Sequence, residues 1–197
     1  MKTPDLTPLP VQNSNVGRWD DRYRGLSARE PQSYGDPLTY KLGAGWLRDC
    51  SMIEDWGTGM GGFRPHMLAV NPNAVVRGID GSVTPFADVV TDLVHYKSDV
   101  EAIFMRHVLE HDHQWSKILS NALESFQKQM VLILFTPMQV KTREIAWNGN
   151  DVPDIGFALP DLMSRFDQAN VKAVMLQRLQ TKTQYGEETV LFLRKET

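Results

Sequence analysis

The sequence predicts one α/β domain with a mostly parallel sheet that is covered by helices on both faces. Segments with strand composition alternate with segments of helical periodicity along most of the chain, which is typical of such sheets. The segment 131–135 is an uninterrupted apolar run, as expected for a central parallel strand buried on both faces. The chain of 197 residues is long enough for one domain of this kind.

The first elements are expected before a glycine-rich turn. A short helix is predicted within 17–30, and a second helix runs from Asp36, its N-cap, through Leu47, with Pro37 in the first turn. The core then begins, in order, with a strand over 51–56, a glycine turn over 57–62, a helix to about residue 70, a strand over 74–80, a short helix over 86–90, a weak edge strand over 89–93 and a strand over 101–105.

The clearest helix is expected over 113–127, because its apolar residues recur at positions i, i+3, i+4 and i+7. Pro137 ends the apolar strand that follows, and residues 138–158 are predicted to be irregular, with a turn at 148–150. The last elements are a short helix over 161–168 and strands over 171–180 and 188–194, which pair as a hairpin. The prediction is therefore a seven-stranded sheet with helices on both faces and a C-terminal antiparallel hairpin.

We expect a single domain over 1–197 with three parts. They are a mobile arm over 1–16, an N-terminal helical cap over 17–50 and the core over 51–197. The cap carries more aromatic surface than a disordered leader needs, in Trp19, Tyr23, Tyr34 and Tyr40. We expect residues 17–40 to fold over the crevice above the strand ends as a lid. The alternative is that these aromatic side chains cover one face of the sheet.

Composition narrows the partners and the compartment. The net charge is −3 and no basic stripe is visible, so the sequence does not favour nucleic acid as a partner. Cys50 is the single cysteine, which excludes an internal disulfide and favours a reducing compartment. No signal peptide and no apolar stretch of membrane-spanning length are visible. We therefore expect a cytoplasmic protein with no membrane partner.

The glycine-rich turn carries the sharpest functional signal. Gly57, Gly59 and Gly61 let the chain turn tightly from a strand into a helix and let backbone approach a ligand. The glycines alone also fit a dinucleotide pattern that ends at Gly62. Asp55 favours a different ligand, because a carboxylate at the strand end repels a pyrophosphate and suits a cationic ligand without phosphate. A turn made only for packing is the alternative.

Two further acids extend this site. Asp80 follows Asp55 by 25 residues, at the end of the next strand, where a carboxylate can accept hydrogen bonds from both ribose hydroxyls. Asp92 lies at the end of the third strand, where it can accept from an adenine amino group. The alternatives are a helix-capping role for Asp80 and a solvated loop position for Asp92.

A histidine-rich segment over 105–113 follows the fourth predicted strand. Strand ends of this kind face the ligand crevice of an open parallel sheet, so His107 or His111 could serve as a general base. These two histidines also have the i, i+4 spacing of metal ligands, but the pattern is not that of a metalloprotease helix. Structural hydrogen bonding is the alternative for each, and for His113. Asp112 is the expected N-cap of the next helix.

These motifs resemble those of class I S-adenosylmethionine-dependent methyltransferases, in particular the type 11 group. The resemblance covers about residues 40–195 and implies a Rossmann-like fold. Residues 55–61 resemble the family's acid and glycine motif, 79–80 its ribose-binding acid, and 104–111 the segment after its fourth strand. Two features depart from the family pattern: Trp56 is bulky, and 127–129 lacks the usual Pro-Gly-Gly type of turn.

The resemblance implies a cofactor site, and the acidic metal-ligand set of catechol-type enzymes is not recognisable in this sequence, so no metal is predicted. Gly57 and Gly59 would lie against the methionine and ribose groups, Asp80 would hold the ribose, and Asp92 and Leu93 would hold the adenine. The full predicted cofactor set is Asp55, Gly57, Thr58, Gly59, Gly61, Asp80, Gly81, Asp92, Leu93, Arg106 and His107. The family has no fixed catalytic base, so His111, with His107 beside it, is our own choice for catalysis.

The sequence thus predicts a methyltransferase that uses S-adenosyl-L-methionine on a small-molecule or carbohydrate-like acceptor, at oxygen. Two other functions stay open. One is a non-catalytic protein that binds S-adenosylmethionine. The other is an NAD-dependent oxidoreductase, which Asp55 and the absence of a Tyr-x-x-x-Lys pair in the second half disfavour.

Overall fold

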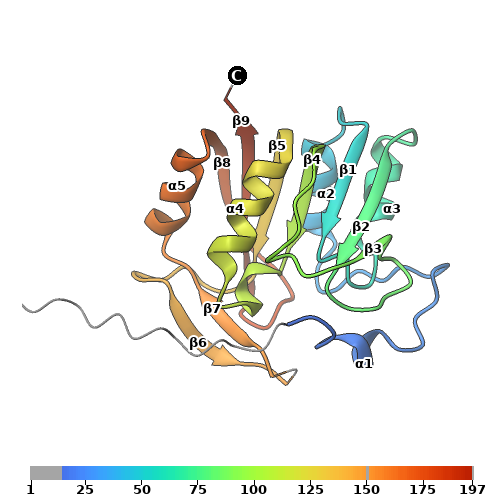
Figure 1. The fold of residues 1–197 in the computed structure, drawn as a ribbon, viewed down its shortest axis with the longest axis horizontal. Helices are drawn as coiled ribbons and strands as arrows, with labels where there is room; N and C mark the ends of the chain where they lie inside the picture. The colour runs from blue at the N-terminus through green and yellow to red at the C-terminus, as the bar shows by residue number, and fades with distance from the viewer. Residues whose placement is uncertain (1–14, 150, 197) are drawn as a thin grey trace, which may run out of the picture.

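The computed structural model describes residues 15–149 and 151–196. Its main sheet has seven strands in the order β3-β2-β1-β4-β5-β9-β8 (Figure 1). The first five strands of that order are parallel, and β9 pairs antiparallel with both β5 and β8. The predicted seven-stranded α/β sheet with its C-terminal antiparallel hairpin is therefore confirmed.

The described strands and helices have the following bounds. The strands are β1 Met52–Trp56, β2 Val75–Asp80, β3 Val89–Val90, β4 Val100–Arg106, β5 Phe126–Leu134, β6 Arg143–Trp147, β7 Pro153–Gly156, β8 Val171–Gln180 and β9 Glu187–Lys195. The helices are α1 Asp20–Tyr23, α2 Leu38–Trp46, α3 Phe63–Val70, the 3-10 turn η1 Leu109–His111, α4 Trp115–Ser125 and α5 Leu159–Gln168.

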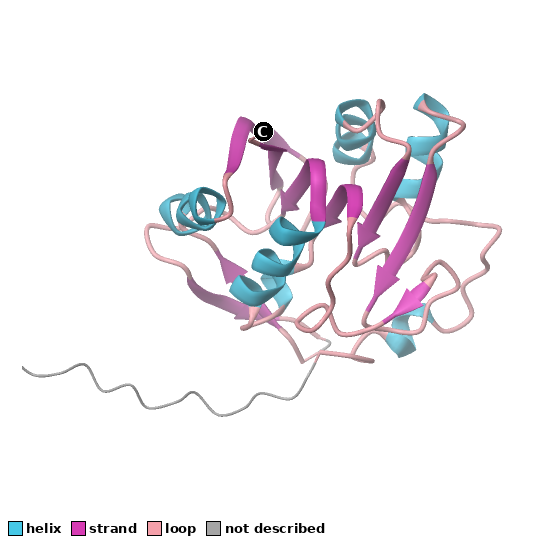
Figure 2. Cartoon of the chain, turned by 45° about the horizontal axis from the view of Figure 1, so that its top comes forward, coloured by secondary structure: helices cyan, strands magenta, loops and turns pink. Residues whose placement is uncertain are grey.

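Helices cover both faces of the sheet, as the apolar strands predict. Helices α2 and α3 lie on one face, and α4 and α5 lie on the other (Figures 1 and 2). Successive side chains of a strand point to opposite faces. In β4, Phe104 packs in the core under α2 and α3, whereas Ile103 and Met105 pack in the core under α4 and α5. All three are at most 1% exposed, so this strand is buried on both sides.

The connection between α4 and β5 differs from the expectation. The helix predicted to reach residue 127 ends at Ser125, and β5 begins directly at Phe126. Residues 127–129 therefore belong to the strand, in agreement with the absence of the usual turn from their sequence. The Ser125 hydroxyl donates to the carbonyl of Asn121 at 2.7 Å and accepts the N–H of Ser98 at 2.9 Å. Phe126 is fully buried and aligned with Val100 of β4, so the chain joins the sheet with no intervening loop.

Two other segments were predicted wrongly. Residues 86–90 form no helix, because Asp88 is tied to β2: its N–H donates to the carbonyl of Gly78 and its carboxylate accepts the N–H of Gly78. Residues 138–158 are not irregular, since β6 and β7 pair antiparallel around the expected turn. Strand β6 is too exposed to show an alternating apolar pattern, so it could not be recognised from the sequence.

The structure describes the N-terminal region from residue 15 onward. Most of the predicted arm, residues 1–14, lies outside the described residues. The helix expected within 17–30 is the single turn α1, and α2 begins beside Asp36, whose carboxylate accepts the N–H of Leu38 at 2.9 Å. Among the described residues, no helix has the length and apolarity needed to cross a membrane. The cytoplasmic location stays a prediction.

Candidate active site

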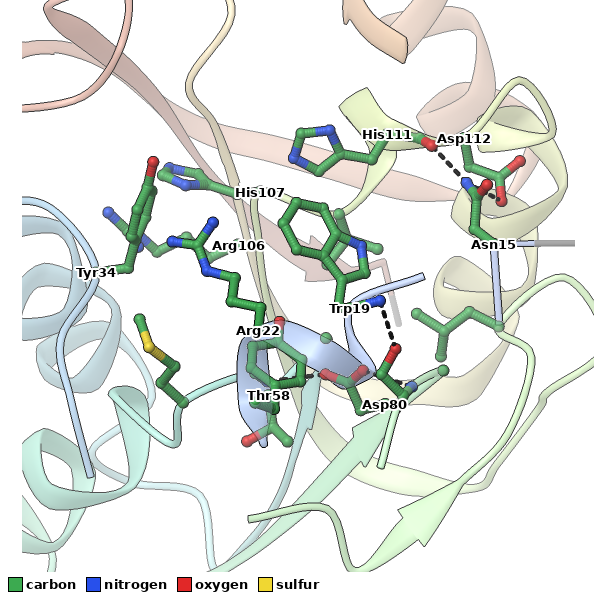
Figure 3. A pocket seen from close by; sticks show the side chains of 18 of the residues that line it. Asn15, Trp19, Arg22, Tyr34, Thr58, Asp80, Arg106, His107, His111 and Asp112 are labelled. Atoms are coloured by element: carbon green, nitrogen blue, oxygen red, sulfur yellow. Dashed lines mark hydrogen bonds between the residues drawn. The ribbon is translucent and has the colours of Figure 1, made fainter. Parts of the chain in front are cut away.

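A cavity of about 460 Å³ opens at the carboxyl ends of the parallel strands (Figure 3). It lies where the strand order reverses between β1 and β4, the place where ligands bind in open α/β sheets. Ten of the residues predicted from the sequence line it: Gly57, Thr58, Gly59, Asp80, Gly81, Asp92, Leu93, Arg106, His107 and His111. The structure therefore brings the glycine loop, the two acids and the two histidines to one site. Asp55 and Gly61 do not line it.

The glycine loop after β1 needs its glycines for its own shape. Gly57, Gly59 and Gly61 have φ angles of 75°, 49° and 72°, a region that favours glycine. A Cβ on Gly57 would lie 2.3 Å from Val108 Cγ2, and one on Gly61 would lie 2.5 Å from the Phe86 ring. Packing thus accounts for Gly57 and Gly61, whereas Gly57 and Gly59 also present backbone to the cavity.

Asp55 supports this loop from behind. Its side chain is buried and accepts the hydroxyl of Thr58 at 2.9 Å. Burial, with a smaller contribution from the nearby Asp80 carboxylate, raises the pKa of Asp55 to about 7, although the hydrogen bond from Thr58 opposes the rise. Asp55, which the sequence predicted to face a cationic ligand, therefore does not line the cavity, but it holds Thr58, which does.

Asp80 lines the cavity and also ties two loops together. One carboxylate oxygen accepts the N–H of Gly59 at 2.8 Å, and the other accepts the N–H of Ser82 at 2.9 Å. Burial raises the pKa of Asp80 to about 6, although these backbone hydrogen bonds oppose the rise. Each oxygen keeps a further lone pair, so Asp80 can still accept hydrogen bonds from a ligand.

Arg106, at the end of β4, has its charge balanced within the protein. Its Nε donates to Glu188 Oε1 at 2.9 Å, and Nη2 lies 2.8 Å from the same oxygen. Nη1 donates to the Tyr40 hydroxyl at 2.9 Å, and the guanidinium lies over the Tyr40 ring. Because the Arg106 and Glu188 side chains are 4% and 0% exposed, this is a buried ion pair at the back of the cavity.

His107 follows Arg106 with a φ of 56°, which is uncommon for a residue other than glycine. Its Nε2 lies 2.7 Å from Glu188 Oε1. Burial lowers the pKa of His107 to about 4, with a smaller lowering from the Arg106 charge, while Glu188 opposes both. The imidazole is therefore neutral at neutral pH.

His111 is held from the opposite side by β7. Its Nδ1 lies 3.1 Å from the carbonyl oxygen of Pro153, 3.4 Å from Asp154 Oδ1 and 3.2 Å from the amide nitrogen of Asn148. Asp154 is fully buried and accepts the hydroxyl of Tyr185 at 2.8 Å. Burial favours a higher pKa for Asp154, but the hydrogen bonds from His111 and Tyr185 outweigh it, so the pKa is lowered. His113 lies outside the cavity, with Nε2 at 3.0 Å from Glu144.

The segment from Asn15 to Tyr34 contributes one wall of the cavity (Figure 3). The N–H of Gly17 donates to the carbonyl of Gly81 at 2.9 Å, and the N–H of Trp19 donates to the Ser82 hydroxyl at 3.1 Å. Asn15 donates to the carbonyl of His111. All four aromatic residues singled out in the predicted cap, Trp19, Tyr23, Tyr34 and Tyr40, line the cavity.

The sequence did not point to three residues that shape this site. Phe135 follows β5 and packs between the two histidines, Asp154 lies in a segment expected to be irregular, and Glu188 lies at the start of β9. Glu188 could have been found from the sequence, because it is an acidic residue just before the apolar run 190–193. Nothing marked Asp154. Among the described residues, no group of three or more His, Cys, Asp or Glu side chains could hold a metal ion.

Comparison with known proteins adds evidence from structure alone. No family model matches the sequence, and no curated protein matches it. The fold is similar to that of a 1,6-didemethyltoxoflavin N1-methyltransferase from Burkholderia thailandensis, at 15% identity and a TM-score of 0.66, over 81% of this chain and 77% of that one. It is also similar to magnesium protoporphyrin IX methyltransferase from Synechocystis, at 13% identity and a TM-score of 0.60, over 91% and 93% of the two chains.

Human N-acetylserotonin methyltransferase is a third similar structure. The identity is 13% and the TM-score is 0.56, over 81% of this chain and 52% of that one. All three proteins were crystallised with S-adenosylmethionine or S-adenosylhomocysteine. The chain therefore has the fold of the class I S-adenosylmethionine-dependent methyltransferases.

Proposed function

We propose that this protein transfers a methyl group from S-adenosylmethionine to an oxygen atom of a small-molecule acceptor. One observation carries the proposal: the glycine loop, the Asp80 carboxylate and the His111 imidazole line a single cavity at the strand ends. The first two suit an adenosine ligand, and the third suits an acceptor that must lose a proton. The similar structures include enzymes named as O-methyltransferases and as an N-methyltransferase, so oxygen is favoured by the histidine and not by the comparison.

The residues present fit the cofactor. Asp80 has free lone pairs for ribose hydroxyls, and Leu93 and Ile118 offer apolar contacts for a base. Asp92 and Asp112 also line the cavity, which suits a cationic ligand without phosphate. When bound, S-adenosylmethionine supplies an electrophilic methyl group on a sulfonium. The protein's part is to hold that group and the acceptor in line, which supplies much of the rate enhancement in such reactions.

His111 is the proposed general base. Two acceptors, the Pro153 carbonyl and the Asp154 carboxylate, face Nδ1, so Nδ1 carries the hydrogen and Nε2 is the basic nitrogen. The Asn148 amide nitrogen also lies 3.2 Å from Nδ1, and it donates its hydrogen to Asp154 Oδ1 at 3.4 Å. Nε2 would take the proton of the acceptor hydroxyl as the oxygen is methylated. The buried Asp154 carboxylate then stabilises the imidazolium that forms, through Nδ1.

The N-terminal segment is proposed as a lid. Its contacts reach both the Gly81–Ser82 loop beside Asp80 and the backbone of His111. One segment therefore bridges the two parts of the cavity: the cofactor half, which contains the glycine loop and Asp80, and the acceptor half, which contains His107 and His111. A covered cavity excludes water and holds the acceptor near the methyl group. The alternative, that these aromatic residues only pack against the sheet, is weakened by their position in the cavity wall.

The test is a labelling screen. The protein is incubated with metabolite extracts, glycans included, and S-adenosylmethionine labelled in its methyl group, and the labelled product is identified by mass spectrometry. Calorimetry should first show binding of S-adenosylmethionine in the micromolar range, about −8 kcal/mol, and far weaker binding of NAD. Tighter binding of NAD would refute the proposal. Binding without transfer to any acceptor would favour a non-catalytic function.

A further inference from the structure

Two histidines flank one aromatic ring in the acceptor half of the cavity. The ring centroids of His107 and His111 lie 4.7 Å and 5.4 Å from that of Phe135. Both side chains line the cavity, and each is fixed by a different carboxylate from the second half of the chain, Glu188 for His107 and Asp154 for His111. The two histidines are four residues apart in the chain, but their partners lie in different strands, β9 for His107 and β7 for His111.

The anchors determine which nitrogen of each ring is free. A carboxylate or a carbonyl oxygen can only accept, so the nitrogen that it contacts must carry the hydrogen. His107 therefore has its hydrogen on Nε2 and a bare Nδ1. His111 has its hydrogen on Nδ1, which two acceptors face, and a bare Nε2; the Asn148 amide nitrogen, 3.2 Å from the same Nδ1, donates to Asp154 Oδ1. Within the described residues, no hydrogen bond reaches either bare nitrogen. Nδ1 of His107 and Nε2 of His111 can thus each accept a hydrogen bond from a ligand. The N–H groups of the two rings are already used by their protein partners.

Aromatic side chains complete this half of the cavity. The Trp19 ring lies 5.2 Å from the His111 ring, and the Tyr34 ring meets the His107 ring edge-on at 6.0 Å. The Arg22 guanidinium lies over both Trp19 and Tyr34, at 5.6 Å and 5.0 Å from their centroids, and so links the two (Figure 3). Walls of this kind favour a flat aromatic ligand.

We propose that the acceptor is a flat aromatic compound with two hydrogen-bond-donating groups, one received by His111 and the other by His107. The inference rests on the proposed methyl transfer and names its substrate class. The hydroxyl at His111 is the one methylated. His107 binds the second hydroxyl or N–H and selects for it, and Glu188 is the positioning residue that keeps Nδ1 of His107 bare.

The selection follows from the cost of an unpaired buried polar atom. A compound with one hydroxyl would cover His107 and leave its Nδ1 without water and without a partner. Sites built to bind a donor discriminate strongly against analogues that lack it. His107 is held in a strained conformation that places it for this contact, and such strain is found at ligand sites more often than elsewhere.

The first test compares three probes on the full chain by calorimetry, with and without saturating S-adenosylhomocysteine. The probes are naphthalene-2,3-diol, 2-naphthol and 2,3-dimethoxynaphthalene. We expect the diol to bind at least about tenfold more tightly than 2-naphthol, and the dimethoxy compound to bind most weakly. His107→Phe keeps a flat ring but no nitrogen, so it should bind the diol and 2-naphthol equally. His113→Phe, outside the cavity, should keep the preference.

The second test starts from the native protein and then uses one variant. In the protein labelled with ¹⁵N-histidine, NMR should show the hydrogen of His107 on Nε2 and that of His111 on Nδ1. Adding the diol should shift the resonance of both bare nitrogens, and 2-naphthol should shift that of His111 alone. Glu188→Gln should disturb the preference of His107 for the Nε2–H form, which a merely structural role would not do.

The outcomes separate this inference from the proposed function. Equal affinity for the diol and 2-naphthol in the native protein, or a hydrogen on Nδ1 of His107, overturns the inference even if S-adenosylhomocysteine binds. Failure of S-adenosylhomocysteine to bind overturns the proposed function. The probe titrations without S-adenosylhomocysteine would still decide whether the two histidines accept hydrogen bonds from two donor groups of one ligand.

Discussion

The carboxylate of Asp80 accepts the backbone N–H of Gly59 at 2.8 Å, so the acid that ends β2 fixes the glycine loop that follows β1. Its other oxygen fixes the N–H of Ser82 in the next loop, to which the N-terminal segment is bound through Trp19. Asp80 therefore combines a structural role with the predicted contact to ribose. The two roles can be separated experimentally, because a neighbouring acid has the first role without the second.

Replacing Asp80 with Ala should weaken binding of S-adenosylmethionine by about 1.5–3 kcal/mol, because charge-assisted hydrogen bonds are lost. It should also lower the free energy of unfolding by about 1–3 kcal/mol, because two backbone N–H groups lose their acceptor. Calorimetry and urea denaturation measure the two effects. Asp88→Ala is the matched control: Asp88 accepts the N–H of Gly78 but does not line the cavity, so only stability should fall. Unchanged cofactor affinity in folded Asp80→Ala would refute the ribose role.

Burial of Asp55 should make stability depend on pH. Its pKa is raised to about 7 in the folded protein, so the folded state binds more protons than the unfolded state between about pH 4 and pH 7. The contribution of Asp55 to the free energy of unfolding therefore falls as pH rises through that range. In Asp55→Asn this part of the fall should vanish. Urea denaturation at about pH 5 and about pH 8 measures it, and parallel pH profiles for the two proteins would contradict the assignment.

Loss of His111 should lower turnover by about 10²-fold or more, because the general base is removed. Asp154→Asn should lower turnover less, since the base remains but its imidazolium loses a charged partner. Cofactor affinity should change less in His111→Ala than in His107→Ala, because His107 adjoins Arg106 in the predicted cofactor set as well as facing the acceptor. His113→Ala, outside the cavity, should have near-native turnover. Near-native turnover in both His107→Ala and His111→Ala would mean that positioning alone accounts for catalysis.

A variant that begins at residue 36 tests the lid. It lacks the contacts of Gly17 and Trp19 with the loop beyond Asp80. We expect it to stay folded and to bind S-adenosylmethionine within about tenfold of the full chain, while it loses most transfer activity. An insoluble variant would show that the segment is part of the core packing. Full transfer activity would rule out the lid.

Gly57→Ala should destabilise the fold by about 1–3 kcal/mol. The φ of 75° is unfavourable for alanine, and the new Cβ would lie 2.3 Å from Val108 Cγ2. Gly45→Ala is the control, because Gly45 lies in α2 with open space around it. That change should raise the free energy of unfolding by about 0.5–1 kcal/mol. Thermal denaturation compares them, and equal effects would mean that the loop can relax.

Local patterns explain how much of the fold the sequence predicts. Uninterrupted apolar runs and glycine turns mark β4, β5 and the loop after β1, because burial on both faces and a positive φ leave a trace in neighbouring residues. Segment 127–129 misled the prediction, since it is polar and yet forms the exposed beginning of β5. Its hydrogen-bond partners belong to strands distant in the chain, such as Arg194, and no local pattern records them.

The same distinction applies to the site. The glycine loop, Asp80, Asp92 and the histidines follow strand ends, so their positions were predictable from the strands. The partners that set each histidine's free nitrogen were not, because Glu188 is 81 positions from His107 and Pro153 is 42 positions from His111. Only folding brings them together.

The pair β6 and β7 stands apart from the seven-stranded sheet, yet it supplies Pro153 and Asp154 to His111. The loop that contains Gly57 and the acid Asp80 come from β1 and β2, at the other end of the cavity. If His111 receives the acceptor, as proposed, changes in β6 and β7 would alter which compound is accepted and leave the glycine loop and Asp80 intact. A family of descendants could diversify its products by varying one hairpin.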